Sequence, residues 1–453
     1  MVGALQLCLV MLIIRWCLPL ALFACAPPSS GKVEAGDSGS DTDTSEAVTS
    51  PKPWLTDDRY VLLNTHEVIV TEVGNESGGT TLVSGVDLDH DGVLEWAAAA
   101  PRSDTYPYSS QTKISVFEGN TLVAERTKDE YGSGAYLLGA GDVSGDGFPD
   151  LLWRACLGNI QCRLQITQGV APETDASLAM NPPGTDYASQ PMALDTLPGS
   201  ATTLVAWWLP SVGITHGPVP VDPSTDEEPN AVSWADALLD NRIPESEDAT
   251  DATHIATVHL IPEPDQGRAH FLLGTFGGWD DASGRVIAHL RICPLRAGID
   301  LQTDCPPLPA DEPIGRKALA ADLDGDGVSE LIGATEAERY NPGALWIFER
   351  DGTWRATVRG IDTHQLGGHL AFVVDDDGER WLLAGDRQPF DTVYAFRSSG
   401  LHGELTTDDA DRFYVDPDGT ELHNMAPYRE TEDGPLWLLV GTSSAVYRRP
   451  FEP

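Results

Sequence analysis

Three short acidic segments, each followed at once by a strand-like run, are the feature of this 453-residue sequence that most constrains its fold. They read DLDHDGVLE from Asp87, DVSGDGFPD from Asp142 and DLDGDGVSE from Asp322. Crowded carboxylates repel one another unless a hard cation lies among them, and oxygen ligands at positions 1, 3 and 5 with glycine at position 6 suit calcium. A helix-loop-helix site needs a bidentate acid at position 12, which is Ala98 in the first copy. The acid stands instead at position 9, so we expect a shorter calcium loop between two strands.

Each loop is expected to hold one calcium ion, about three in all, with position 7 contributing a backbone carbonyl. The alternative is an Asp/Gly-rich turn without metal, which three matches to one ligand template disfavour. The predicted ligand sets are Asp87, Asp89, Asp91, Val93 and Glu95; Asp142, Ser144, Asp146, Phe148 and Asp150; and Asp322, Asp324, Asp326, Val328 and Glu330.

The spacing of the acidic segments predicts a repeat. The second segment begins 55 residues after the first and the third begins 180 residues after the second, a gap of about three such units. Seven candidate second strands can be aligned, and six candidate third strands follow them. Their β-branched and aromatic runs, bounded by Gly, Pro and Asn, are typical of antiparallel strands. The second strands are LEWAAAAP, DLLWRA, TTLVAWWLP, HFLLGTFGG, ELIGATE, RWLLAGD and LWLLVGTSS.

Seven units of three or four short strands predict an all-β fold, a seven-bladed β-propeller of antiparallel four-stranded blades with the calcium loops between first and second strands. No sustained helical period occurs, and WADALLD around Trp234 is a short exception. The last unit has only three strands before Pro453. We therefore expect RYVLLNTHEVIVTEV, near the N-terminus, to supply the missing strand and to close the ring.

The repeated unit resembles the FG-GAP repeat of integrin α-subunit propellers and the VCBS repeat of bacterial exported proteins. The resemblance implies calcium binding by the acidic loops of the first, second and fifth units. Glu95 and Glu330 depart from the more usual aspartate at position 9, and Ser144 replaces an acid at position 3, so the second site is expected to be weaker. VVDDDGERW in the sixth unit keeps three aspartates but compresses the loop, and we assign no metal site to it.

The N-terminus predicts a bacterial export signal over residues 1–25. Arg15 precedes an apolar run that ends in LFAC, which has the shape of a lipobox whose Cys25 is lipidated. The first ten residues carry no charge, so a start at Met11 fits a signal better than a start at Met1. A transmembrane anchor is the alternative, but Arg15 and the small-residue end favour cleavage. We expect a lipid-anchored envelope protein, at the outer membrane, that touches the membrane only through its lipid.

Composition predicts how the rest of the chain is divided. Residues 26–57 are polar, acidic and poor in apolar side chains, as in a flexible tether, and residues 58–453 form the predicted propeller. An acidic insertion at about 216–252 is expected to be a solvated loop; the alternatives are a cap on one face and a binding segment for a cationic partner. Four cysteines of the exported part form two close pairs, and we expect two local disulfides, Cys156 with Cys162 and Cys293 with Cys305.

The loops between second and third strands are the predicted ligand-binding rim. They lie on the face opposite the calcium loops, because successive loops of an up-and-down blade alternate between faces. Exposed aromatic side chains beside polar groups suit ligand recognition, whereas packing of each aromatic on its own blade is the alternative. The rim residues are Tyr106, Tyr108, Trp279, Asp280, Tyr340, Arg387 and Phe390.

Charge and motifs limit the function. The formal net charge of -42 disfavours nucleic acid and anionic membrane faces as partners. No GxSxG elbow, HExxH helix, P-loop or dinucleotide fingerprint occurs in the sequence. We expect a monomeric propeller that binds an envelope or extracellular protein or a glycan. The alternatives are a structural subunit of an envelope assembly, and a polysaccharide- or lipid-acting enzyme with catalytic residues on scattered loops.

Overall fold

The computed structural model describes residues 57–63, 67–70, 81–100, 111–129, 135–142, 147–157, 161–167, 175–178, 191–196, 203–207, 211–215, 236–237, 254–261, 270–280, 285–295, 299, 301–335, 342–361, 366–386, 392–416, 422–442 and 445–452. Contacts divide the chain into Met1–Lys52 and Pro53–Pro453, and all described residues belong to the second unit. The predicted signal, lipidated Cys25 and most of the tether therefore lie outside the described residues. Among the described residues, no helix has the length and hydropathy needed to cross a bilayer.

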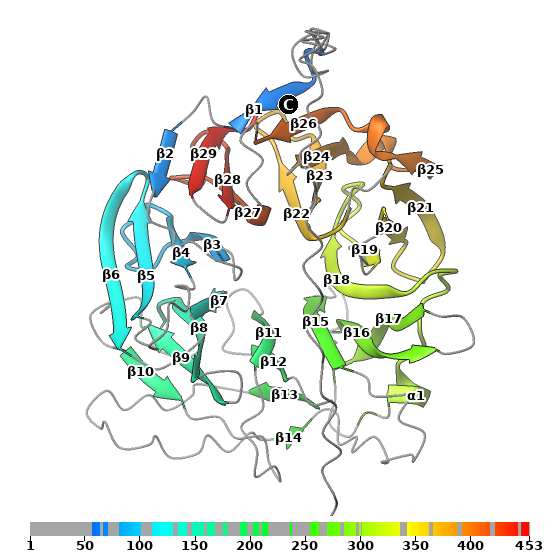
Figure 1. Cartoon of the computed structure of the whole chain (residues 1–453), viewed down its shortest axis with the longest axis horizontal. Helices are drawn as coiled ribbons and strands as arrows, with labels where there is room; N and C mark the ends of the chain where they lie inside the picture. The colour runs from blue at the N-terminus through cyan, green and yellow to red at the C-terminus, as the bar shows by residue number, and fades with distance from the viewer. Residues whose placement is uncertain are drawn as a thin grey trace, which may run out of the picture. The chain divides into compact units, whose positions relative to one another are not determined.

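The first three sheets are antiparallel meanders in chain order (Figure 1). The first contains β3 (Thr81–Val86), β4 (Glu95–Ala100), β5 (Gln111–Glu118) and β6 (Thr121–Asp129). The second contains β7 (Ala135–Gly141), β8 (Asp150–Leu157), β9 (Gln161–Thr167) and β10 (Asp175–Leu178). The third contains β11 (Pro191–Thr196), β12 (Thr203–Trp207), β13 (Ser211–Thr215) and β14 (Asp236–Ala237).

The fourth and fifth sheets follow the same order. The fourth contains β15 (His254–Ile261), β16 (His270–Asp280) and β17 (Arg285–Pro294), and the short helix α1 (Leu301–Asp304) comes after it. The fifth contains β18 (Ile314–Ala321), β19 (Glu330–Thr335), β20 (Ala344–Phe348) and β21 (Trp354–Arg359), and β25 (Gly403–Thr406) joins its outer edge.

The last two sheets include strands from the N-terminal part of the chain. The sixth contains β22 (His369–Val374), β23 (Arg380–Gly385), β24 (Thr392–Arg397), β26 (Arg412–Val415) and β1 (Tyr60–Leu62), with the 3-10 helices η4 (Ser398–Gly400) and η5 (Thr407–Asp409) between β24 and β26. The seventh contains β27 (Leu422–Tyr428), β28 (Trp437–Thr442), β29 (Val446–Pro450) and β2 (Glu67–Val70).

The strand predictions agree with these elements. Each predicted second strand is an inner strand of its sheet, namely β4, β8, β12, β16, β19, β23 or β28. The sequence did not reveal a third strand in the third unit, where β13 lies. The helical reading of WADALLD is not supported, because Asp236 and Ala237 form β14 and pair with β13. Tertiary pairing overrides local helical propensity there.

The prediction of uniformly antiparallel, four-stranded sheets is corrected at two outer edges. β25 pairs parallel to β21, and β1 pairs parallel to β26. The fourth sheet has three strands within the described residues. An outer strand carries unpaired backbone N–H and C=O groups on one side, and a further strand satisfies them.

The two ends of the described chain meet in the seventh sheet. β2 pairs antiparallel with β29, with Val68 opposite Tyr447. The sequence predicts that the N-terminal segment supplies the strand that the last unit lacks, and this pairing confirms it.

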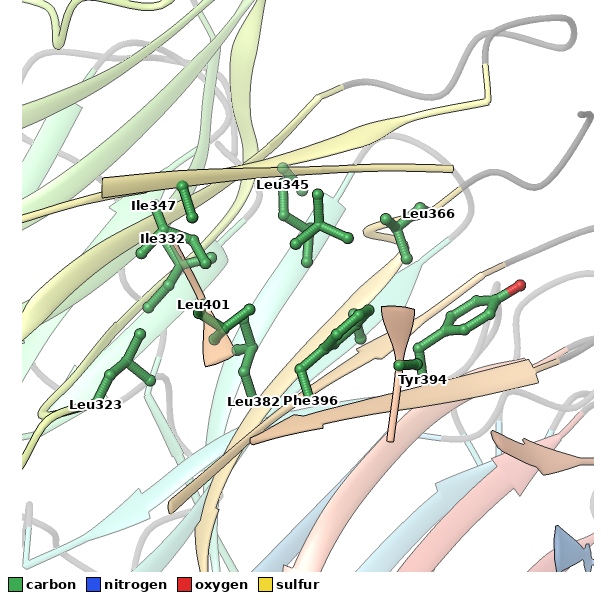
Figure 2. Packing of buried hydrophobic residues seen from close by; sticks show 14 of the residues in the cluster. Leu323, Ile332, Leu345, Ile347, Leu366, Leu382, Tyr394, Phe396 and Leu401 are labelled. Atoms are coloured by element: carbon green, nitrogen blue, oxygen red, sulfur yellow. The ribbon is translucent and has the colours of Figure 1, made fainter. Parts of the chain in front are cut away.

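Buried apolar side chains pack between neighbouring sheets. Figure 2 shows Ile332, Leu345 and Ile347 of the fifth sheet with Leu382 and Phe396 of the sixth in one buried cluster. First strands of consecutive sheets contact one another: β3 with β7, β7 with β11, β11 with β15, β15 with β18, β18 with β22, β22 with β27, and β27 with β3.

Tryptophans of the second strands belong to this core. Trp96, Trp153 and Trp381 are each at most 1% exposed. Their position inside the sheets supports a packing role rather than a sugar-binding one.

Candidate metal centre

The first acidic loop, residues 87–94, connects β3 to β4 and is wrapped around its own carboxylates. Asp87 Oδ2 accepts a hydrogen bond from Gly92 N at 3.2 Å, and Asp91 Oδ1 accepts one from Val93 N at 2.8 Å. Gly92 has φ +89°, a left-handed conformation that glycine adopts without steric cost. The Asp/Gly pattern therefore folds the loop locally, by aspartate side chains that cap nearby backbone N–H groups.

Glu95 closes this loop at the first residue of β4. Its side chain is buried, with the residue 5% exposed, and Oε2 accepts a hydrogen bond from Leu88 N at 2.7 Å. Burial, with a smaller contribution from the charges of Asp89, Asp87 and Asp91, raises the pKa of Glu95 to about 7, against the hydrogen bond from Leu88, which lowers it. A cation among these groups would restore the charged form of Glu95.

The donor set of the first loop fits a hard cation. Carboxylate oxygens of Asp87, Asp89 and Asp91 lie within 4.8 Å of one another. Oxygens that ligate one calcium ion at 2.3–2.6 Å are at most about 5 Å apart. Asp87 Oδ1 is buried and has no hydrogen-bond partner, which is costly for a carboxylate oxygen unless a cation satisfies it.

The loop of residues 322–329, between β18 and β19, repeats this geometry. Asp322 Oδ2 accepts from Gly327 N at 3.2 Å, and Asp326 Oδ1 accepts from Val328 N at 2.7 Å. Glu330 Oε2 accepts from Leu323 N at 2.6 Å, and burial raises the pKa of Glu330 to about 7. Oxygens of Asp322, Asp324 and Glu330 lie within 4.8 Å of one another.

Arginines distinguish this loop from the first. Nη1 of Arg355 lies 3.3 Å from Asp324 Oδ2 and 3.6 Å from Glu330 Oε2. Nη2 of Arg380, from the next unit, lies 4.0 Å from Asp322 Oδ2. The sequence analysis missed both residues, because neither lies within the acidic motif.

The second loop is described only at its ends. Asp142 Oδ2 accepts from Gly147 N at 3.2 Å, as in the other two loops, and Asp150 is fully buried at the start of β8. Ser144 and Asp146 lie outside the described residues. The Phe148 ring stacks on His90 with centroids 4.4 Å apart, so the first two loops touch.

The compressed loop of the sixth unit uses its first aspartate as a turn cap. Asp375 Oδ1 accepts from Asp377 N at 3.0 Å and Glu379 N at 2.9 Å, and Oδ2 accepts from Trp381 Nε1 at 2.8 Å. Three donors engage this buried carboxylate, so hydrogen bonds from nearby residues stabilise the turn.

The predicted cysteine pairs lie close along the chain. Cys293 and Cys305 have bonded sulfur atoms and Cα atoms 4.8 Å apart. Cys156 of β8 is directly opposite Cys162 of β9 in the backbone register. Neighbouring antiparallel strands bring the second pair together.

The predicted ligand rim falls mostly outside the described residues. Tyr106, Tyr108, Tyr340, Arg387 and Phe390 lie there. Trp279 and Asp280 end β16, opposite Val286 and Arg285 of β17 in the backbone register. The rim therefore stays a prediction.

Comparison with known proteins identifies the fold. No family model matches the sequence, and no curated protein matches it. A solved structure, BBS1N in complex with ARL6DN, soaked with mercury, is similar to the chain with a TM-score of 0.51 and 10% sequence identity, over 85% of this chain and 95% of that one. At this identity the likeness concerns the fold alone. The protein is an all-β chain of multiple antiparallel sheets, and its neighbour is a β-propeller domain of BBS1, so the fold is of the β-propeller class.

Proposed function

We propose that this protein is a calcium-stabilised, seven-bladed β-propeller of the FG-GAP kind, held at a bacterial envelope by a lipid on Cys25, that binds a macromolecular ligand. The observation that carries the calcium assignment is the orphaned, buried Oδ1 of Asp87 within a cluster of three converging carboxylates. A hard cation would satisfy that oxygen and neutralise the cluster.

Three observations support the blade count. Seven sheets occur among the described residues, each with a strand that contacts the first strand of the next sheet, and β27 contacts β3. The pairing of β2 with β29 joins the two ends of the described chain. A propeller hides its sheet edges by this kind of radial repetition.

The recognition role has its support in the neighbour and in the charge. BBS1N is bound to ARL6DN in the similar structure, which favours a protein as the ligand. The net charge of -42 favours a cationic surface on that ligand.

Calcium titration of the purified protein tests the calcium assignment. We expect millimolar calcium to raise the unfolding free energy relative to excess chelator, by about 2.7 kcal/mol for each site held at a hundred times its dissociation constant. Magnesium at equal concentration is expected to stabilise less, because it demands a tight octahedral shell.

Matched aspartate variants identify the loop responsible. Asp91→Asn should remove much of the calcium-dependent gain, whereas Asp377→Asn, an exposed aspartate of the sixth-unit turn, should leave it unchanged. Equal stability in calcium and chelator for the unsubstituted protein would refute the calcium assignment.

Ligand binding needs its own test. Co-sedimentation of the protein with purified envelope, before and after protease treatment, separates a protein ligand from a glycan. Binding that Tyr106→Ala and Tyr108→Ala together abolish, with unchanged thermal stability, supports recognition by the rim. Co-purification at fixed stoichiometry would indicate a structural subunit, and loss of substrate over time would indicate an enzyme.

A further inference from the structure

Two acidic loops of the same sequence pattern differ in what faces them. The loop at 322–330 has an arginine among its carboxylates. In the part of the chain that the structure describes, no cationic side chain forms an ion pair with Asp87, Asp89, Asp91 or Glu95.

The arginine comes from the fourth strand of the same sheet, which lies between β20 and β25. Arg355 lies in β21, and its side chain is 3% exposed. Its guanidinium reaches Asp324 at 3.3 Å, Glu330 at 3.6 Å and Glu349 at 3.7 Å. Its Nε also donates to the carbonyl of Leu401 at 3.3 Å, which fixes the orientation of the group.

Strand register identifies the matching residue in the first sheet. In the fifth sheet Phe348 is opposite Trp354 and Ile347 is opposite Ala356, so Arg355 is the extra residue of a bulge. In the first sheet Phe117 is opposite Leu122 and Val116 is opposite Ala124, so the extra residue there is Val123.

The surrounding acids are matched as well. In the first sheet, Glu95 is opposite Glu118. In the fifth sheet, Leu331 is opposite Phe348, and one step further along the two strands come Glu330 and Glu349. Glu330 and Glu349 thus stand where Glu95 and Glu118 stand in the first sheet. The two sites share their acids and differ at the bulge, where one has Val123, 48% exposed, and the other has Arg355.

We propose that the guanidinium of Arg355 neutralises the carboxylates of the loop at 322–330, so that this loop is stable without a metal ion. The calcium requirement of the protein is then concentrated in the loop at 87–95. The inference rests on the calcium binding proposed above. A buried guanidinium 3.3 to 3.6 Å from two ligand carboxylates repels an incoming divalent ion and occupies oxygens that the ion needs. The fourth-strand bulge therefore sets the calcium affinity of each site.

Exchange of the two bulge residues tests the proposal. Isothermal titration with calcium is performed on full-length proteins in which Asp142→Asn disables the second loop. A further Asp91→Asn leaves only the loop at 322–330 intact, and a further Asp326→Asn leaves only the loop at 87–95 intact. We expect the loop at 87–95 to bind calcium at least about tenfold more tightly than the loop at 322–330. Val123→Arg should weaken the first loop about tenfold, and Arg355→Val should strengthen the other by a similar factor.

Unfolding in excess chelator provides a readout that does not depend on calcium binding. Arg355→Met, which keeps much of the length but removes the charge, should unfold at lower urea than the unsubstituted protein, and Arg355→Lys should restore most of the difference. Val123→Arg should unfold at equal or higher urea, because it adds a cation to an uncompensated acidic cluster.

The outcomes separate this inference from the proposed function. Equal calcium affinities of the two loops, unchanged by either exchange, would overturn the inference while calcium binding stands. Absence of calcium binding at every loop would overturn the proposed calcium site and the affinity difference, while the chelator experiment would still decide whether Arg355 compensates its loop. Equal unfolding of the Arg355→Met and Arg355→Lys proteins would refute that role.

Discussion

Glu95 is a buried carboxyl group at the start of β4, so its charge state depends on the groups that surround it. In chelator its pKa is raised from 4.5 to about 7 by burial first and by the neighbouring aspartates second. The folded state then binds a proton more readily than the unfolded state between these two values. The free energy of unfolding consequently falls as pH rises from about 4.5 to 7 and stays reduced above that range.

The pH dependence of stability gives the first prediction. In chelator, Glu95→Gln should be more stable than the unsubstituted protein at pH 8, because the amide can still accept the Leu88 hydrogen bond without a buried charge. In calcium the order should reverse, because the variant loses a charged ligand. Urea denaturation at pH 5 and pH 8 measures both; the same order in calcium and chelator would exclude Glu95 as a ligand.

Asp375 provides the second prediction, with no dependence on metal. Asp375→Ala leaves the N–H groups of Asp377, Glu379 and Trp381 without this acceptor. We expect a loss of about 1–3 kcal/mol in the free energy of unfolding, equal in calcium and chelator. Asp377→Ala is the control, since Asp377 is exposed. A loss that calcium reverses would assign a metal to this turn.

At the level of elements, outer-edge pairing distinguishes this propeller from a simple meander. β1, β2 and β25 each extend an outer edge, and β1 and β2 come from the start of the described chain. The pairing of β2 with β29 makes the last sheet depend on residues more than 370 positions away in the sequence, since Val68 is opposite Tyr447. We expect such a contact to form late in folding, because the loop-closure entropy of a long intervening chain must be overcome before it forms.

Truncation tests the importance of these edge strands. A protein that lacks residues 1–70 should unfold at markedly lower urea and aggregate more readily than one that lacks residues 1–57, because removal of β1 and β2 exposes the outer edges of β26 and β29. Light scattering during thermal unfolding measures aggregation. Identical behaviour of the two proteins would show that the edge strands are dispensable.

At the scale of the whole molecule, self-repulsion opposes the folded state. The net charge is -42 on 453 residues, and part of it is gathered in the acidic loops. Compaction brings these charges together, and salt screens them over about 10 Å at 0.1 M.

Salt dependence gives the prediction at this scale. In chelator, the unfolding temperature should rise when sodium chloride increases from 50 to 500 mM. With saturating calcium the rise should be smaller, because bound ions have already neutralised the most crowded carboxylates. An equal salt response in both conditions would show that the charge repulsion does not arise mainly in the acidic loops.

The sequence by itself determined the repeated strands, the acidic loops between first and second strands, and the closure of the last sheet by an N-terminal strand. These features depend on short-range physics. Alternating apolar residues form strands, and aspartates such as Asp87 and Asp91 cap backbone N–H groups only two to five residues away. Burial of Glu95 and Glu330 follows from their place at the start of a core strand.

Tertiary structure alone decided which groups surround each loop. Arg355 follows Glu330 by 25 residues and Val123 follows Glu95 by 28, so no motif spacing relates them; only the bulged register of the fourth strands shows that they are equivalent. The parallel additions of β25 and β1 are likewise invisible in a strand pattern, because the partner of an outer edge is set by three-dimensional proximity. Local hydrogen bonds fix the shape of an acidic loop, whereas its charge balance depends on side chains that the fold brings from distant positions.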